Sequence, residues 1–202
     1  MNQHSETQTI QYYDEHADEY VRATVSVNMG SLYEPFLSHV PPSGRILDAG
    51  CGSGRDSKEF LGRGYHVTSI DASRKMVQAA TALTAQKAHL MAFQEVGFSE
   101  KFDGVWACAS LLHVSLRELP GIIGRLASVL RPSGVFYASF KMGLGERNQD
   151  GRLFTDIDEV TFTSLVSGIG ELELLRLWHS DDQRPNRNDQ WLNALLRKAV
   201  AD

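Results

Sequence analysis

The stretch RILDAGCGSGRDS (residues 45–57) joins a short apolar run to three glycines at every second position. A short apolar run bounded by turn-forming residues is typical of a buried strand, so RILDA (45–49), which follows the breaker PPSG (41–44), is predicted to be one. Residues 55–63 have the pattern of a helix that ends at a glycine. The stretch therefore predicts a strand, a glycine loop and a helix.

The glycine loop does not have the spacing of the common phosphate-binding loops. A phosphate loop needs a lysine and then a serine or threonine after its last glycine, and here Arg55 and Asp56 follow. A dinucleotide fingerprint needs its third glycine at position 55, one place later than Gly54. Asp48 and Asp56 flank the loop, and carboxylates disfavour a pyrophosphate while suiting a cationic amino group.

A second acidic residue points to the ligand of this loop. Asp71 ends the next predicted strand, HVTSID (66–71), 17 positions after Gly54. A carboxylate at the carboxyl end of that strand can accept hydrogen bonds from both hydroxyls of a ribose. The loop and Asp71 together predict an adenosine-containing ligand without a pyrophosphate, and the alternative is a surface turn followed by an incidental aspartate.

Strands and helices alternate along the rest of the chain, which predicts an α/β fold with a doubly wound, mostly parallel sheet. A polar turn too short for a crossover helix separates the last two strand patterns, so these are expected to form an antiparallel hairpin. Residues 1–202 are predicted to be a single domain, with a core over 45–198 and lid helices within about 10–40. Further strands are expected at 89–93, 104–109, 135–141, 171–179 and 190–198, and helices at 10–22, 30–39 and 116–130. Another helix is expected after Ser73, which can cap it, with an apolar face at Met76, Ala80 and Leu83.

Composition limits the class of protein. The 202 residues carry 20 Lys and Arg against 25 Asp and Glu, a net charge of −5, which argues against general nucleic-acid binding. Cys51 and Cys108 are too far apart and too few for a disulfide framework or a metal site. The chain shows no secretory leader and no apolar run of membrane-spanning length, so a cytoplasmic protein without a membrane partner is expected.

Four motifs in order give the chain a resemblance to a family. ILDAGCGSG, VTSIDAS, KFDGVWACASLLHV and LRPSGVFYASF resemble the ordered motifs of class I S-adenosylmethionine-dependent methyltransferases, over residues 10 to 198. The resemblance implies a Rossmann-like, seven-stranded sheet with an antiparallel last strand. It also implies S-adenosyl-L-methionine as cofactor, with S-adenosyl-L-homocysteine as the product.

The same resemblance implies roles for particular residues. The loop of Gly50, Cys51, Gly52 and Gly54 would lie behind the methionine part of the cofactor, as would Asp48 at its start, and Asp71 would bind the ribose. The remaining cofactor contacts that it implies are Ala72, Met76, Phe93, Gln94 and Glu95 near the adenine, Ser110 and Leu111 on the floor, and Tyr13 and Tyr20 from the lid helix. Many relatives have an acid at the adenine amino group, and here Gln94 and Glu95 compete for that place. Tyr13 and Tyr20 could instead simply pack the helix onto the sheet.

His113 follows the fourth predicted strand, where a general base could act on the methyl acceptor. A lone histidine is more often hydrogen-bonded to the backbone or part of a cavity wall, and that interpretation is favoured here. The two interpretations predict different results, because loss of a base would abolish turnover and spare cofactor affinity.

Two late segments carry positive charge and could face one cleft: the glycine-rich loop 141–155 and the turn 179–187. Gathered cations in an acidic protein suggest an acceptor that is anionic or carries a carboxylate. The late turn also loosely resembles one in tellurite-resistance methyltransferases. An equally favoured alternative to an anion-binding cleft is a solvated surface on which Arg147 pairs with a neighbouring acid. The candidates for acceptor binding are Lys141, Arg147, Arg152, His179, Arg184 and Arg187.

The leading functional hypothesis is a small-molecule methyltransferase, acting by in-line displacement as a monomer or weak homodimer. A tRNA or protein methyltransferase is the alternative, which one continuous basic face would favour. A third hypothesis is a non-catalytic S-adenosylmethionine-binding protein, and the least favoured is a nicotinamide oxidoreductase.

Overall fold

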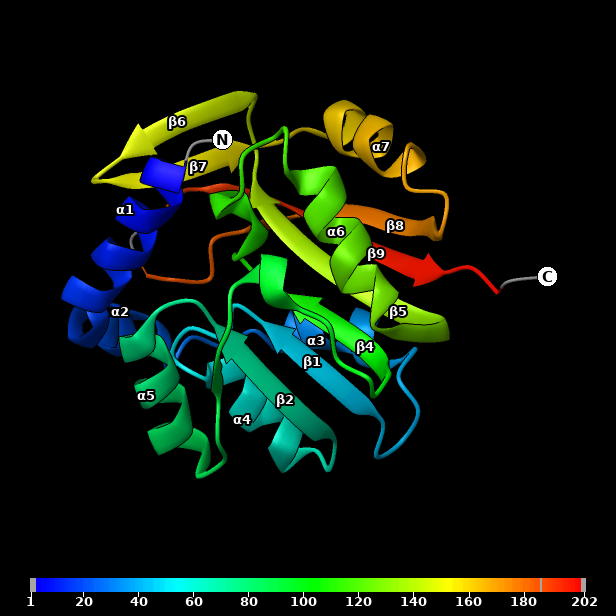
Figure 1. The fold of residues 1–202 in the computed structure, drawn as a ribbon, viewed down its shortest axis with the longest axis horizontal. Coiled ribbons are helices and arrows are strands. Elements are labelled where there is room, and N and C mark those ends of the chain that lie inside the picture. The colour runs from blue at the N-terminus through cyan, green and yellow to red at the C-terminus, as the bar shows by residue number, and fades with distance from the viewer. Residues whose placement is uncertain (1–2, 186, 201–202) are drawn as a thin grey trace.

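The computed structural model describes residues 3–185 and 187–200, and the ends of the predicted domain (1–2 and 201–202) lie outside it. Seven strands form one sheet in the order β3-β2-β1-β4-β5-β9-β8 (Figure 1). The strands are β1 (Arg45–Ala49), β2 (His66–Asp71), β3 (His89–Leu90), β4 (Phe102–Ala107), β5 (Leu130–Lys141), β8 (Leu172–Asp181) and β9 (Gln190–Lys198). Only β9 runs against its neighbours in this described sheet, so the predicted doubly wound α/β fold with an antiparallel last strand is confirmed.

Helices cover both faces of the sheet, and each face has its own apolar core. One core packs α6 (Leu119–Ser128) and α7 (Glu159–Ser167) against the strands. The other packs α3 (Gly30–Leu37) and α4 (Arg55–Gly62), and it includes the stacked rings of Trp106 and Tyr137, 3.9 Å apart. Figure 1 shows α6 in front of the sheet and α3 and α4 behind it. The central strands are therefore buried on both faces, which is why their sequences read as continuous apolar runs.

Several helices and strands have boundaries that differ from the predicted ones. The helix expected at 10–22 is two helices, α1 (Gln3–Glu15) and α2 (Ala17–Thr24), because the backbone leaves the helical region at His16, whose ring stacks on Tyr12. The strand expected at 89–93 is only the two residues of β3, and the short 3-10 helix η1 (Phe93–Glu95) begins where it was expected to continue. The helix α5 (Arg74–Thr84) starts as predicted, with the Ser73 hydroxyl accepting from the Met76 N–H.

The prediction of a loop at 141–155 is wrong. The segment forms a separate antiparallel hairpin of β6 (Gly145–Gln149) and β7 (Arg152–Asp156), in which Arg147 lies opposite Phe154. Leu153, Phe154 and Thr155 are buried, and this burial fixes the hairpin against the body of the protein. The helix α7 follows directly and was not predicted.

The carboxyl ends of the parallel strands meet at one edge of the sheet, where ligands bind in folds of this type. Helix α1 crosses that edge between α5 and β7 (Figure 1). Its Asp14 carboxylate accepts from the Ser73 hydroxyl at 2.6 Å and from the Lys75 N–H at 3.0 Å, at the start of α5. The sequence between 10 and 24 therefore forms a cover over the ligand edge.

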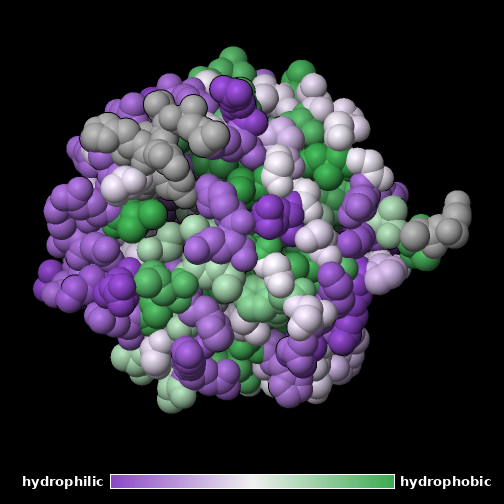
Figure 2. All heavy atoms as spheres, viewed as in Figure 1, coloured by the Kyte–Doolittle hydropathy of each residue, from purple (hydrophilic) through white to green (hydrophobic). Residues whose placement is uncertain are grey.

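The face that carries α5 and α6 mixes hydrophilic and hydrophobic residues without one continuous apolar area (Figure 2). Within 3–185 and 187–200, no helix combines the length and apolar character that a membrane span requires.

Candidate functional site

The glycine loop after β1 is held against β2 by its own backbone. The N–H groups of Gly50 and Cys51 both donate to the Ile70 carbonyl at 2.9 Å. Gly50, Gly52 and Gly54 all have positive φ (80°, 51° and 81°), a conformation that side chains disfavour. A Cβ on Gly50 would lie 2.4 Å from the Ser110 Cβ. The turn therefore favours all three alternating glycines, and the close approach of Ser110 adds a second requirement at Gly50.

Asp71 ties the loop to the second strand and faces a cavity. Its carboxylate accepts from the Gly52 N–H at 2.9 Å and the Ser73 N–H at 2.8 Å. Burial raises the pKa of Asp71 to about 6, although these two N–H groups oppose the shift. The carboxylate keeps further lone pairs for hydroxyl donors in the cavity.

That cavity, of about 100 Å³, lies beneath α1 and beside the glycine loop. Most of the residues predicted to contact the cofactor line it: Tyr13, Tyr20, Gly50, Gly52, Asp71, Ala72, Met76, Phe93 and Ser110. Sequence reasoning missed Thr9, Ile10, Ser73, Met91, Ala92, Ala109 and Val114, which also line it, and the cavity includes His113, as the favoured interpretation of that histidine predicted. Met91, Ala109 and Val114 belong to the main core or pack against it, so their spacing alone did not distinguish them.

Three predicted residues of the loop region lie behind it instead. Asp48 is buried and accepts from the Ser57 hydroxyl at 2.6 Å, and burial beside Asp56 raises its pKa to about 8. Cys51 packs in an apolar cluster with Ala80. A Cβ on Gly54 would lie 2.8 Å from the Ala80 Cα, so this glycine serves the contact between α4 and α5. Asp48, Cys51 and Gly54, predicted to contact the cofactor, therefore do not line the cavity beside the loop.

Three other predicted contacts also point elsewhere. Leu111 is fully buried in the main core. Gln94 and Glu95 have exposed side chains in η1, and the Glu95 carboxylate accepts from the Ala92 N–H at 2.7 Å. Glu95 therefore caps its own turn, and the competition between these two residues for the adenine has no counterpart in the cavity wall.

A second, larger cavity of about 330 Å³ adjoins the first. The walls of both include Tyr13, Tyr20, Ala109 and His113, so the two cavities meet at these side chains. Of the predicted acceptor-binding residues, Lys141, Arg152, Arg184 and Arg187 line the larger cavity. The hairpin β6–β7 and the turn between β8 and β9 thus face one cavity, as the charge pattern predicted.

Arg147 and His179 do not reach that cavity. The Arg147 guanidinium is bound by Asp156 at 2.6 Å on its own hairpin, which is the alternative left open for it. The His179 Nε2 lies 3.1 Å from Glu159 on α7. Its neighbour Ser180 lines the cavity, and successive residues of a strand point to opposite faces, so His179 faces away.

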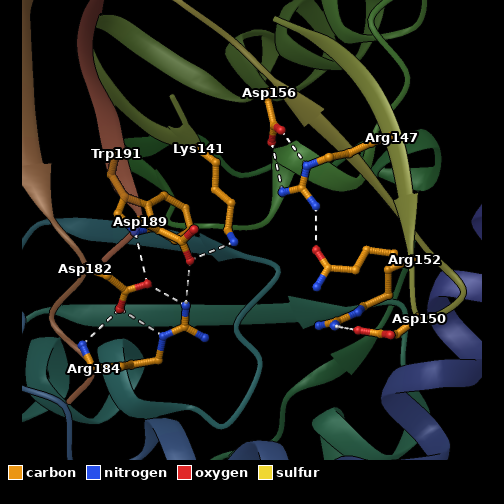
Figure 3. Close-up of polar contacts among 10 residues, drawn as sticks. Lys141, Arg147, Asp150, Arg152, Asp156, Asp182, Arg184, Asp189 and Trp191 are labelled. Carbon is orange, nitrogen blue, oxygen red and sulfur yellow. Dashed lines mark hydrogen bonds and ion pairs between the residues drawn. The ribbon is translucent and has the colours of Figure 1, made fainter. Parts of the chain in front are cut away.

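Most cations of the larger cavity are engaged by acids (Figure 3). The Lys141 Nζ contacts the Asp189 carboxylate at 2.8 Å. The Arg184 guanidinium binds both oxygens of Asp182, whose carboxylate is almost fully buried. These pairs fix the side chains in place and offset most of the positive charge.

Arg55 also lines the larger cavity and was not singled out from sequence. The neighbouring Asp56 binds it with two hydrogen bonds, at 2.6 and 2.9 Å, and also accepts from the Tyr33 hydroxyl and the Trp106 indole N–H. Burial alone would raise the pKa of Asp56, but the positive charge of Arg55 and these four donated hydrogen bonds hold it below its usual value. The position of Arg55 directly after Gly54, the last glycine of the loop, was the sequence signal that could have identified it.

Tyr13 and His113 form a hydrogen-bonded pair where the cavities meet. The His113 Nδ1 lies 2.6 Å from the Leu153 carbonyl, which can only accept, so Nδ1 carries the proton. The Nε2 therefore accepts from the Tyr13 hydroxyl at 2.8 Å. Burial lowers the pKa of His113 to about 4 and raises the pKa of Tyr13, so both are neutral at pH 7. His113 is thus bonded to the backbone and also lines the cavities.

Residues 46–134 match the family model described as a methyltransferase domain. The chain is 30% identical over 145 residues to a malonyl-[acyl-carrier protein] O-methyltransferase of Salmonella typhimurium, covering 71% of this chain and 47% of that one. It is 33% identical over 105 residues to the protein of the same name from Erwinia pyrifoliae, covering 50% and 39%. The chain spans less than half the length of these two relatives.

A solved structure shows the same fold. The 1,6-didemethyltoxoflavin-N1-methyltransferase of Burkholderia thailandensis, with 1,6-didemethyltoxoflavin and S-adenosylhomocysteine bound, superposes with a TM-score of 0.76 at 21% identity. The match covers 96% of this chain and 87% of the other. The likeness therefore extends beyond the family model to α1 and the final hairpin.

Proposed function

Because the chain belongs to the class I S-adenosylmethionine-dependent methyltransferases, we propose that it moves the cofactor's methyl group to a small acceptor molecule with an anionic group. One observation carries this proposal. The cavity at the glycine loop and the cation-lined cavity meet at Tyr13, Tyr20, Ala109 and His113. A donor in one and an acceptor in the other would be aligned across that junction, which is what an in-line displacement requires.

The residues of the smaller cavity fit the cofactor. Asp71 offers a buried carboxylate to the ribose hydroxyls, and Met76 and Phe93 offer apolar surface to the adenine. The loop at Gly50 and Gly52 leaves no room for side chains, since a Cβ at either would approach Ser110 or Tyr20. When bound, S-adenosylmethionine supplies a methyl group on a positively charged sulfur.

The larger cavity suits a small acceptor better than a macromolecule. Its lining cations are gathered inside a cavity instead of on an open face, and Lys141, Arg152 and Arg184 each have a carboxylate partner. A polynucleotide is usually bound by a continuous basic surface with free charges. The arrangement therefore supports a small-molecule acceptor over tRNA.

Tyr13 and His113 provide a route for the proton that such an acceptor loses. The Tyr13 oxygen has lone pairs that can accept this proton while its own proton passes to the His113 Nε2. The Leu153 carbonyl keeps the imidazole in the tautomer that can receive it. With a pKa near 4, His113 suits acceptors whose proton becomes acidic as the new bond forms.

The Tyr13→Phe variant tests this route. We expect the initial rate of S-adenosylhomocysteine formation to fall about 100-fold, as for loss of a general base, while S-adenosylhomocysteine affinity stays within about threefold. The rate is measured by mass spectrometry with the best acceptor from a panel of small carboxylic acids and amines. Tyr65→Phe, a half-buried tyrosine away from both cavities, is the control. An unchanged rate in Tyr13→Phe would remove the proton route, and no product with any acceptor would count against the proposed function.

Cofactor affinity should depend on pH through Asp71. Ribose hydroxyls donate to the ionised carboxylate, so affinity is expected to be constant above pH 7 and to fall about tenfold per pH unit below about 6. The folding stability of the free protein should change in the opposite direction. The folded pKa exceeds the unfolded one, so the protonated form favours folding, and stability gains as pH falls from about 6 to about 4. Calorimetric titration with S-adenosylhomocysteine from pH 5 to 8 measures the first effect, and a flat profile would contradict it.

A further inference from the structure

Arg152 differs from the other cations of the larger cavity in how it is held. It begins β7, and its side chain is 16% exposed. Its guanidinium carbon lies 4.0 Å from the centroid of the Tyr12 ring and 5.1 Å from that of Phe154. Two rings from different elements thus fix the guanidinium, and Arg152 lines the cavity beside the junction residue Tyr13.

The hydrogen bonding of Arg152 is incomplete. Its ion pair is a long one, 3.3 Å from a terminal nitrogen to the largely exposed Asp150 carboxylate, and the guanidinium also hydrogen-bonds the Tyr13 hydroxyl. Its Nε is buried and has no hydrogen-bond partner among the described residues. A buried N–H without an acceptor is unfavourable, whereas Arg55 and Arg184 each have two close hydrogen bonds to a carboxylate. The Arg152 guanidinium, at the wall of this cavity, therefore has a donor still to be satisfied.

The unsatisfied donor of the Arg152 guanidinium favours a planar anion with a single negative charge. The Nε and the adjacent terminal nitrogen of arginine form a fork that matches the two oxygens of a carboxylate. Asp150, a carboxylate, already makes the weak version of this contact (Figure 3). A phosphate dianion would call for a second free cation close by. Lys141 is already paired with Asp189, and Arg187, which has no acidic partner among the described residues, lies exposed on the turn between β8 and β9 and not on the hairpin of Arg152.

We propose that Arg152 binds a carboxylate of the methyl acceptor in place of Asp150, so that the enzyme's acceptors are carboxylic acids. This inference rests on the proposed methyltransferase function and names its substrate class. The bound carboxylate lies beside Tyr12 and Tyr13 of α1 and therefore near the junction of the two cavities. Arg152 is a specificity residue that contacts the acceptor without taking part in bond making.

A matched set of ligands tests the proposal: 3-phenylpropanoate, 3-phenylpropanol, 3-phenylpropylamine and 2-phenylethyl phosphate, each titrated into the protein saturated with S-adenosylhomocysteine. Ligand-detected NMR registers the millimolar affinities expected of such fragments. We expect the acid to bind at least tenfold more tightly than the alcohol and the amine. Arg152→Gln should remove that preference, and Arg152→Lys, which keeps the charge but loses the fork, should keep part of it.

Arg147→Gln is the matched control, because it makes the same change on the same hairpin at a guanidinium already bound by Asp156. It should alter the acid's affinity by less than twofold. Equal binding of acid and alcohol, or equal losses in Arg147→Gln and Arg152→Gln, would overturn the proposal. Tighter, Arg152-dependent binding of the phosphate would replace the carboxylate by a phosphate. S-adenosylhomocysteine affinity and melting temperature of each variant verify the fold; failure of the wild type to bind S-adenosylhomocysteine would reject the proposed function, and this inference with it.

Discussion

Asp71→Asn is expected to raise the dissociation constant for S-adenosylhomocysteine about 100-fold. Hydrogen bonds to a charged group contribute about 1.5–3 kcal/mol each, and the neutral amide weakens both ribose contacts. The substitution also disturbs the loop, because both oxygens of Asp71 accept from backbone N–H groups, those of Gly52 and Ser73. An amide can accept only one of these hydrogen bonds and turns its NH₂ toward the other donor. The effect on affinity should therefore exceed that of losing the ribose contacts alone.

Isothermal titration calorimetry at pH 7.5 measures the change, and Glu173→Gln on the exposed face of β8 is the control for loss of one charge. The control should bind with unchanged affinity. If Asp71→Asn bound S-adenosylhomocysteine within threefold of the wild type, the adenosine would not occupy the smaller cavity as proposed. The variant should also lose the decline in affinity below pH 6, since position 71 no longer titrates.

Asp56→Ala should produce the largest loss of stability, about 3–5 kcal/mol in the free energy of unfolding. Removing this carboxylate leaves the Arg55 guanidinium, 19% exposed, without its partner. It also removes the acceptor of the Tyr33 hydroxyl and the Trp106 indole N–H in the core behind the sheet. An uncompensated buried charge and two orphaned donors act in the same direction.

Chemical denaturation followed by tryptophan fluorescence measures this loss. Glu34→Ala is the matched control, because Glu34 also pairs with an arginine, Arg63, at 2.6 Å but is 71% exposed. An exposed ion pair contributes at most about 1 kcal/mol, so the control should unfold almost as the wild type does. Similar losses in the two variants would show that the Arg55–Asp56 pair has no special structural role.

The fold could be predicted from sequence where local pattern and burial agree. The strand at 45–49 lies between the breaker PPSG and Gly50, and the strand at 66–71 follows the helix that ends near Gly64; they form β1 and β2 with the predicted limits. The final hairpin was predictable because its polar turn leaves no room for a crossover. The hairpin β6–β7 was missed because β6, GERNQ, is polar and mostly exposed, so it shows neither an apolar run nor alternation.

The candidate site was predictable to the level of its loops, but side-chain direction was not. Gly50 and Gly54 belong to the same alternating glycine pattern, yet Gly50 approaches Ser110 at the cavity and Gly54 packs on Ala80. Arg147 and Arg152 lie on one hairpin, where Asp156 of the same hairpin binds Arg147 and the distant Tyr12 of α1 covers Arg152. Such differences depend on residues distant in the chain, which spacing does not report.

Helix α1 touches both halves of the site at once. Its Asp14 holds the start of α5 beside the smaller cavity, while its Tyr12 covers Arg152 in the larger one. Tyr13, between them, is bonded to His113 at the junction. The proposed cofactor and the proposed acceptor would therefore both lie against this one helix, so that a movement of α1 would change both compartments together.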